Sequence, residues 1–561
     1  MSDAFGYTPL DARARERSEA LKGPRACKDA LWAAVFLAHL ALVAALAAMH
    51  VPELIAAARD GLHDPGANAT LEPQMQAALT HSAELAWPYL LVGLGVAFVW
   101  SIAWIGIVQA FAESLIYIAL IATPAVFLAL TLWPGNPSPV ATGVFFIVTM
   151  FYACWIVLTQ RNRVEFARLT LATVAGVIRT HPGMWIVSLL SMVPAVAWQL
   201  AWLMTAGATF FHFRAHGERF SYVDSRTGES REGVSIGALG VITLVFLLLS
   251  TYWTSQVISN VVHVTNSGVL ATWYFRQRSR LPRPTVHALG RALSTSFGSI
   301  CLGSLLVALV QLLHDMAESA RQNSAEGGLV SSIVWCCVVC FIGYLEALIA
   351  LFNHWAFTQV AIYGKDFKTA ARHTWHLVEA RGLSGLVNMN LTSNAVGLGV
   401  LLGGVLSAAL VAGLAHDRLL VAPTSKPGVS EDVQGVYAAA YALTIAAAAV
   451  CAVACTTTIS SAVTSGVTTL FVCWAEDPAA LLASNPPLHA SFEHISSGFL
   501  RDHPPRHGPG PDGRADVENP RPLPAQQYQA PTVAVGTPVG QQPPPPNVPV
   551  AHAVPASQAG P

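Results

Sequence analysis

Long apolar runs recur along most of the chain and predict membrane-spanning helices. Ten runs approach the roughly 20 residues that an α-helix needs to cross the hydrocarbon core of a bilayer. They cover residues 30–50, 87–107, 113–133, 139–159, 183–205, 236–258, 297–315, 330–352, 391–414 and 436–470. The last run exceeds one crossing, so its end is expected to bend or to extend into the cytoplasm. The pattern predicts an all-α, polytopic membrane protein.

Apolar residues also recur at helical spacing in two connections between these runs, 163–180 and 366–381. The apolar faces are formed by Phe166, Leu169, Thr173 and Val177, and by Phe367, Ala370, Ala371, Thr374 and Val378. The opposite faces carry Arg168 and Arg179, and Lys368 and Arg372. Such patterns are typical of interfacial amphipathic helices. They either brace the ends of the spans at the headgroups or take part in gating.

The composition agrees with a membrane protein. Hydrophobic residues make up 53% of the chain and charged residues only 11%, whereas soluble domains carry about 25% charged residues. The net charge is −1, so no overall positive field favours nucleic acid as a partner. The partner that these proportions predict is the lipid bilayer.

Positive charge orients the predicted spans. Most of the 31 Lys and Arg residues lie in cytoplasmic segments if the N-terminus is inside, as the positive-inside rule requires. An even number of crossings then places both termini in the cytoplasm. The sequon at Asn68 falls outside, where it can be glycosylated.

Residues 260–275 (NVVHVTNSGVLATWYF) fit neither lipid nor water. They follow a complete span, and the basic segment 276–283 comes directly after them, so both of their ends belong on the cytoplasmic side. One alternative is a re-entrant or interfacial segment that breaks at Asn266, Ser267 and Gly268. The other is a continuation of the helix below the membrane. In the first case the stretch would line or gate the inner mouth of a pathway, through Asn266, Gly268, Trp273 and Tyr274.

The chain divides into three parts on composition. Residues 1–29 are a charged cytoplasmic segment, 30–475 hold the spans, and 476–561 form a tail with many of the 35 prolines. Such a tail is expected to be disordered and partly polyproline II. SH3 or WW modules bind segments of this kind, and a tail without a specific partner is the alternative.

No motif for catalysis, a cofactor or a metal stands out. The sequence contains no nucleotide-binding loop and no zinc-protease or zinc-finger spacing. Cys336, Cys337 and Cys340 resemble metal spacing, but they lie in an apolar run, where helix packing is the expected role. The prediction is a protein that is not an enzyme and holds no cofactor or metal.

The informative residues are polar groups at membrane depth. Glu346 lies in an apolar run without another acid, and a charge there must be buried, paired or turned toward water. Glu346 either binds a substrate or proton or makes a structural hydrogen bond. Glu113 starts a span and either snorkels or carries protons, and His263 is either a packing residue or a proton acceptor. Tyr252 and Trp253 offer aromatic faces of the kind that attract quaternary ammonium groups.

Several segments resemble one known family, the choline transporter-like family, in its fungal Pns-type branch. They are SQVISNVVHVTNSGVLATWYF at 255–275, STSFGSICLGSLLVALVQLL at 294–313, LEALIALFNHWAFTQVAIYGKDF and the residues that follow it at 345–391, and FVCWAEDPAALLASNP at 471–486. The resemblance implies ten spans, cytoplasmic termini and a place in the plasma membrane.

The resemblance also implies transport of choline, or of ethanolamine in some members, with proton exchange. On this reading Glu346 supplies negative charge, Tyr252, Trp253 and Asn353 line the path, and His263 and Glu113 are the proton candidates. Two alternatives stay open: a scaffold or receptor that acts through its Pro-rich tail, and an enzyme acting on lipid.

Overall fold

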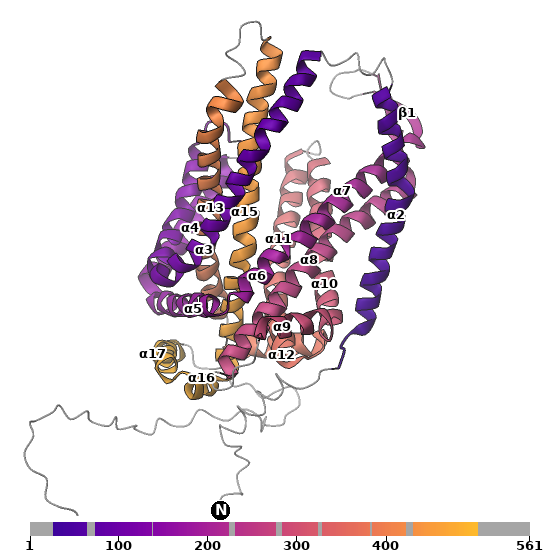
Figure 1. Cartoon of the computed structure of the whole chain (residues 1–561). Helices are drawn as coiled ribbons and strands as arrows, with labels where there is room; N and C mark the ends of the chain where they lie inside the picture. The colour runs from indigo at the N-terminus through magenta and orange to yellow at the C-terminus, as the bar shows by residue number, and fades with distance from the viewer. Residues whose placement is uncertain are drawn as a thin grey trace, which may run out of the picture. The chain divides into compact units, whose positions relative to one another are not determined.

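The computed structural model describes residues 26–63, 73–136, 139–223, 230–276, 283–323, 328–381, 384–421 and 430–502. Nearly all of these residues are helical (Figure 1). The long helices are α2 (Ala30–His63), α3 (Pro73–Leu132), α4 (Pro139–Thr159), α7 (Met192–Ala215), α8 (Gly237–Arg276), α10 (Phe297–Asn323), α11 (Gly328–Tyr363), α13 (Ser384–Ala415) and α15 (Glu431–Glu476). The shorter ones are α5 (Arg161–Thr180), α6 (Gly183–Leu190), α9 (Pro284–Leu293), α12 (Phe367–Arg381), the π-helical turn η3 (His416–Val421), α16 (Pro478–Ser484) and α17 (Pro486–Asp502).

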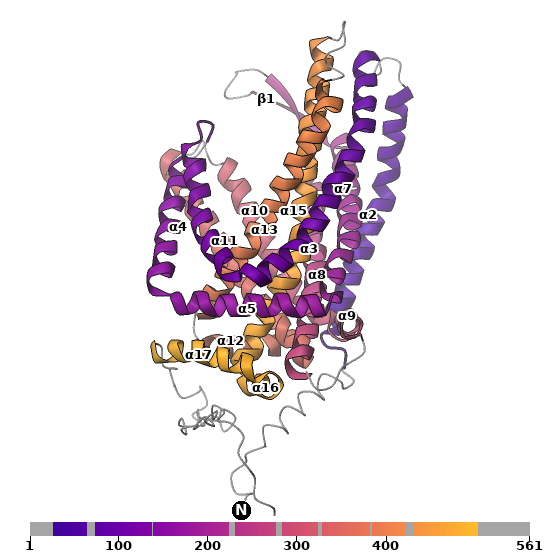
Figure 2. The same cartoon turned by 60° about the vertical axis from the view of Figure 1, so that its left-hand side comes forward.

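Nine helical segments in the described part of the chain are long and apolar enough to cross a membrane. One of them, Thr80–Leu132 in α3, has 53 residues and would extend about 80 Å, against a hydrocarbon core of about 30 Å. At Phe111 the backbone leaves the helical region, with φ −125° and ψ 27°. Figure 2 shows α3 as two limbs that meet at a bend. The second and third predicted runs are therefore two crossings of one bent helix, and the predicted all-α polytopic fold is confirmed.

The stretch 260–275 continues α8 without a break. Helix α8 runs as one helix from Gly237 to Arg276, so the predicted interruption at Asn266–Gly268 is wrong. Hydroxyl groups in this stretch bond to the helix itself: Thr265 Oγ1 donates to Val261 O at 2.7 Å, and Thr272 Oγ1 donates to Gly268 O at 2.8 Å. Polar side chains therefore do not need a helix break here, because carbonyls of the preceding turn accept their protons.

Several short helices lie across one end of the long ones, as both views show (Figures 1 and 2). Two of them, α5 and α12, are the predicted amphipathic helices. Phe166 and Val177 of α5 and Phe367 and Thr374 of α12 are buried, and Lys368 is exposed. The apolar faces therefore pack on the ends of the spans.

Helix α12 begins at a capped turn. Asp366 Oδ2 accepts hydrogen bonds from the backbone N and the Oγ1 of Thr369, both at 3.0 Å. Burial by itself raises the pKa of the Asp366 carboxyl, but these hydrogen bonds outweigh burial and hold its pKa below the usual value. Asp366 is thus a charged N-cap of α12.

The prediction that a disordered tail begins at residue 476 is wrong for residues 477–502. Asp477 caps α16 by accepting a hydrogen bond from Ala480 N at 3.2 Å. Leu481 of α16 and Phe492 of α17 are fully buried, and the ring centroids of Phe492 and Phe166 are 5.3 Å apart. The two helices thus belong to the folded part of the chain. Residues 503–561 lie outside the described residues.

Helix α13 packs very closely on α3. A Cβ added to Gly399 would lie 2.0 Å from Trp104 Cε2, and one added to Gly403 would lie 2.7 Å from Trp100 Cδ1. Trp100 Nε1 donates a hydrogen bond to Gly399 O at 2.9 Å. The two glycines therefore make room for indole rings between the helices, which is the close approach that small residues allow in membranes.

The start of α2 is tied to two other helices. Asp29 has a left-handed φ of 53°, and its Oδ2 accepts hydrogen bonds from Ser299 Oγ at 2.6 Å and Phe367 N at 2.9 Å. A Cβ at Gly298 would lie 2.2 Å from Asp29 O. This contact joins the first span to α10 and α12.

One element departs from the all-α prediction. Strands β1 (Glu218–Val223) and β2 (Ser230–Ser235) pair antiparallel, with Glu218 opposite Ser235. They follow α7 and precede α8, in the connection predicted to be an outer loop.

Candidate functional site

A cluster of polar side chains joins α8, α10 and α11. Tyr252 of α8 donates a short hydrogen bond from its hydroxyl to Asp315 Oδ2 of α10. The neighbouring residue of α10, His314, has its Nδ1 3.0 Å from Glu346 Oε2 of α11. Glu346 is also close enough to Tyr252 for an electrostatic interaction with its phenol group. The Glu346 side chain is 25% exposed. We call Tyr252, His314, Asp315 and Glu346 the acidic cluster.

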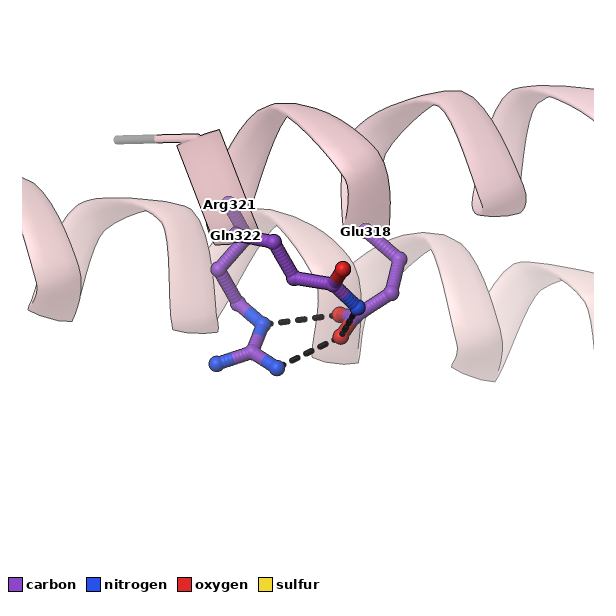
Figure 3. A network of polar contacts seen from close by, with 3 residues as sticks. All are labelled: Glu318, Arg321 and Gln322. Atoms are coloured by element: carbon purple, nitrogen blue, oxygen red, sulfur yellow. Dashed lines mark hydrogen bonds and ion pairs between the residues drawn. The ribbon is translucent and has the colours of Figure 1, made fainter. Parts of the chain in front are cut away.

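Neither carboxyl group of the acidic cluster has a Lys or Arg partner in the described part of the chain. Among the described residues, the partners of Asp315 and Glu346 are a phenol and an imidazole. Glu318, one turn further along α10, differs: Arg321 donates to it from Nε at 2.7 Å and from a terminal guanidinium nitrogen at 2.5 Å (Figure 3). Arg321 thus neutralises Glu318 by a bidentate pair. The acidic cluster keeps the capacity to balance an added cation.

A seam of polar pairs continues from the acidic cluster along α8 and α10. Gln256 Nε2 lies 3.4 Å from Gln311 Oε1, and Asn260 Nδ2 donates to Ser304 Oγ at 3.0 Å. Together with Tyr252, these α8 residues recur at intervals of four, so they share one helix face. Polar groups thus follow the α8–α10 contact toward the short-helix end.

Two residues predicted to line the path with Glu346 have structural partners instead. Trp253 is buried and donates from Nε1 to Cys301 O at 2.9 Å. Asn353 is buried and donates from Nδ2 to Gly303 O at 2.6 Å. Both side chains attach α10 to its neighbours. Of the four predicted substrate residues, the structure brings Tyr252 and Glu346 together in the acidic cluster.

His263 belongs to a second polar group, between α8, α11 and α15. Its Nδ1 lies 2.9 Å from Ser465 Oγ, and its Nε2 lies 2.9 Å from His354 O. The Nδ1 atoms of His263 and His354 are 3.3 Å apart, with the rings nearly perpendicular. A hydrogen bond between them requires a proton on one nitrogen only. The pair is thus able to hold a shared proton.

A third polar group lies where α15 ends. Gln359 Nε2 and Tyr363 OH of α11 each donate a short hydrogen bond to the Glu476 carboxylate. Next to it, Tyr274 OH donates to Asp477 O at 2.9 Å. Tyr274 is fully buried. The predicted gate residue Tyr274 thus fixes the end of α8 to the start of α16.

The other predicted gate residues lie in tight packing. Asn266 is fully buried, and its Nδ2 donates to Ser188 Oγ of α6 at 3.2 Å. The Oδ1 of Asn266 and the Oγ of Ser267 are buried and have no hydrogen-bond partner among the described residues. A Cβ at Gly268 would lie 3.1 Å from Ala288 Cβ of α9, and Trp273 is half-buried. The stretch therefore sits among α6, α9 and α15, with unused polar atoms inside.

The structure does not bring Glu113 to His263. Glu113 follows the bend in α3, its side chain is 61% exposed, and its Oε2 lies 3.7 Å from Arg168 Nε of α5. This is a weak surface pair. Asn68, the predicted glycosylation site, lies outside the described residues.

Four acidic and histidine side chains of these groups were not predicted as site residues. Asp315 and His314 sit at the end of a predicted span, where polar residues are ordinary, and His354 follows Asn353 in an aromatic segment. Glu476 lies beyond the end that was predicted for the last run. The one available signal was spacing: Tyr252, Gln256 and Asn260 place polar side chains at every fourth residue of an apolar helix.

A surface groove in the described part of the chain lies elsewhere. It lies between α5 and α17 and is lined by Glu165, Arg168, Leu169, Ala490, Ser491, His494 and Ile495. It is a shallow junction of two surface helices, whereas the polar groups above lie between spans. We therefore take the spans, not this groove, as the candidate site.

Comparison with known proteins agrees with this arrangement. The family model described as plasma-membrane choline transporter matches residues 144–479, which is more than half of the chain and includes the acidic cluster, the histidine pair and Glu476. Protein PNS1 of Eremothecium gossypii is 31% identical over 333 residues, which cover 57% of this chain and 58% of that protein.

Other relatives have similar sequence identities and cover similar shares of the chain. Protein PNS1 of Saccharomyces cerevisiae is 30% identical over 54% of this chain and 56% of its own length. A CTL-like protein of Dictyostelium discoideum is 28% identical over 58% of this chain and 54% of its own length. The matches span a little more than half the length of these curated relatives. With the family model covering residues 144–479, the chain is a member of the plasma-membrane choline transporter family.

Proposed function

We propose that the chain transports choline or a related amine across the membrane. The observation that carries this proposal is the acidic cluster, in which Asp315 and Glu346 both lie near Tyr252 and have no Lys or Arg partner among the described residues. A quaternary ammonium cannot donate an N–H hydrogen bond, so it is recognised by negative charge and aromatic faces. The cluster offers two carboxyl groups and the ring of Tyr252.

The energetic argument favours a cation at this position. A carboxylate at membrane depth is costly unless it is paired or hydrated. At an effective dielectric constant of about 20, two opposite charges 4 Å apart attract by about 4 kcal/mol. A cation between Asp315 and Glu346 would therefore offset part of the cost that their burial imposes. Family membership supports the same class of solute.

The polar groups further along α8 suggest the route of the solute from the acidic cluster to the inner side. From the acidic cluster, Gln256 and Asn260 lead to the histidine pair and then toward Glu476. We propose that the partnerless Asn266 Oδ1 and Ser267 Oγ become solvated when the inner side opens, since buried polar atoms rarely stay unpaired. On this proposal the pair His263 and His354 carries the coupled proton, and Asn266, Gly268, Trp273 and Tyr274 form the inner gate.

The test is uptake of radiolabelled choline into proteoliposomes that contain the purified chain. Saturable uptake is expected, and it should fall in Glu346→Gln and in Asp315→Asn. Glu318→Gln is the matched control, because Glu318 lies one turn from Asp315 but is already paired with Arg321. Absence of saturable uptake for choline and ethanolamine at every imposed pH gradient would refute the proposal.

One deletion distinguishes transport from the alternative, a scaffold or receptor that acts through its tail. Removing residues 503–561 leaves every helix described above in place. A transporter keeps its flux after this deletion, whereas a scaffold that recruits SH3 or WW modules loses its partner. Binding of such modules to the tail remains a separate proposal.

A further inference from the structure

Three side chains from the C-terminal halves of α2 and α7 lie close together. Figure 1 shows the C-terminal ends of these two helices opposite to α5, α9 and α12. The three side chains are His50, Glu53 and His212, and each offers one ligand atom within 4.8 Å of the others. His212 Nδ1 lies 2.7 Å from Glu53 Oε2. The ring centroids of His50 and His212 are 4.3 Å apart. We call this set the α2–α7 histidine site.

A second observation concerns His50 alone. His50 is only 9% exposed, and its buried Nδ1 has no hydrogen-bond partner in the part of the chain that the structure describes. A buried imidazole nitrogen left unpaired costs about 1–3 kcal/mol. The imidazole lies against the rings of His212 and Phe213, which hold it in place. Its Nδ1 is left without a hydrogen bond in this position. A bound ligand would satisfy this atom.

The donor set matches a divalent transition metal. Imidazole nitrogen and carboxylate oxygen are usual ligands of Zn²⁺, and two histidines with one acid form a three-residue set that leaves a position open. His216 is one turn beyond His212, and its ring centroid is 4.6 Å from that of His212. Its Nδ1 lies 3.0 Å from His212 O, so the Nε2 of His216 is the atom that could serve as a fourth ligand. Ca²⁺ and Mg²⁺ prefer oxygen ligands only, so the two imidazoles disfavour them.

We propose that His50, Glu53 and His212 bind one Zn²⁺ ion or a similar transition-metal ion, and that the ion ties α2 to α7. The metal would replace the proton that Glu53 and His212 now share, so binding releases that proton. The site is separate from the acidic cluster, so the proposal does not depend on the substrate.

The position of α2 gives the clamp a structural consequence. Below the site, His39 Nε2 lies 2.7 Å from Ser250 Oγ of α8, and the rings of Phe36 and Trp253 are 5.2 Å apart. Helix α2 thus packs on α8 directly beside Tyr252. A metal that fixes α2 on α7 therefore also restricts how far α2 can move from α8.

The test uses Co²⁺ as a spectroscopic probe and Zn²⁺ as its competitor. The full chain is purified through a tag without histidine, stripped with a chelator and titrated with Co²⁺. Visible d–d bands that saturate at one equivalent and disappear on addition of Zn²⁺ are expected. His212→Gln and Glu53→Gln should each weaken binding at least about tenfold. His81→Ala is the matched control, because His81 of α3 faces Tyr437 and not the site.

A second measurement keeps the test decisive. Excess Zn²⁺ should raise the melting temperature of the stripped wild-type chain, since a ligand that binds only the folded state stabilises it. His50→Ala should abolish this rise, and His212→Gln carries the test if His50→Ala does not fold. Wild-type protein without Co²⁺ bands and without a Zn²⁺-dependent shift would overturn the proposal. So would unchanged binding in folded His212→Gln.

Discussion

Asp315 and Glu346 differ from their neighbour Glu318 in the partners they have. Glu318 is held by a guanidinium. Asp315 instead accepts from a phenol, and Glu346 contacts an imidazole. At the scale of the residue, this difference in partners separates a site that can accept a cation from an ion pair that is already complete.

The histidine pair leads to a prediction about coupling. Replacing His354 by Phe keeps a ring against His263 but removes the nitrogen that lies 3.3 Å from His263 Nδ1. Choline uptake driven by a pH gradient should fall at least about tenfold, while exchange of choline at equal pH should persist. The measurement is uptake with and without an imposed gradient. Unchanged gradient dependence would remove the pair from the coupling step.

Asp366 gives a prediction about stability and pH. The pKa of Asp366 is lower in the folded chain than its usual value of about 3.9. Its contribution to stability is therefore complete above about pH 4 and is lost as pH falls through the lowered value. The melting temperature of wild-type protein should drop more steeply below about pH 4 than that of Asp366→Asn. Parallel curves for the two proteins would contradict this assignment.

At the scale of the elements, glycine positions decide how closely helices approach. Gly399→Ala should destabilise the fold by about 1–3 kcal/mol, because the added Cβ meets the Trp104 ring. Gly397→Ala is the matched control on the same helix, since nothing lies within 4 Å of its Cβ. There, alanine should be neutral or stabilising by up to about 1 kcal/mol. Thermal unfolding of both variants in detergent is the measurement, and equal effects would contradict the packing.

Most elements could be predicted from the sequence because lipid imposes a simple rule. A span needs about 20 apolar residues, and an interfacial helix shows one apolar face. The bend at Phe111 could not be predicted, because nothing between residues 107 and 113 resembles a loop or a breaker. Helices α16 and α17 were missed because hydropathy does not detect burial of Leu481 and Phe492 against other elements.

The polar sites were harder to predict than the helices. Glu346 stands out because it is an acid in an apolar run, and Tyr252 because of its neighbours. Asp315, His314 and Glu476 lie at the ends of predicted spans, where polar residues are common. Their roles depend on which helices lie side by side, and helix periodicity carries no such information. The same limit hid His50 and His212, which lie far apart in sequence.

At the scale of the whole molecule, the orientation in the membrane remains a prediction. We expect both termini in the cytoplasm, and Asn68 on the outer side, because most basic residues then lie inside. Glycosidase treatment of protein made in a eukaryotic host should shift its mobility, and Asn68→Gln should abolish the shift. The sequence has a second sequon at Asn390, which this orientation places on the inner side. A glycan at Asn390 instead of Asn68 would reverse the orientation.

The central claim is that the acidic cluster binds the transported cation. Its most direct test is saturable uptake of radiolabelled choline by proteoliposomes with wild-type, Asp315→Asn, Glu346→Gln and Glu318→Gln protein at equal incorporation. The account predicts that the first two variants lower uptake at low choline concentration at least about tenfold, because each removes one charge from the site, while Glu318→Gln transports like wild type. Wild-type uptake in both Asp315→Asn and Glu346→Gln would contradict the account.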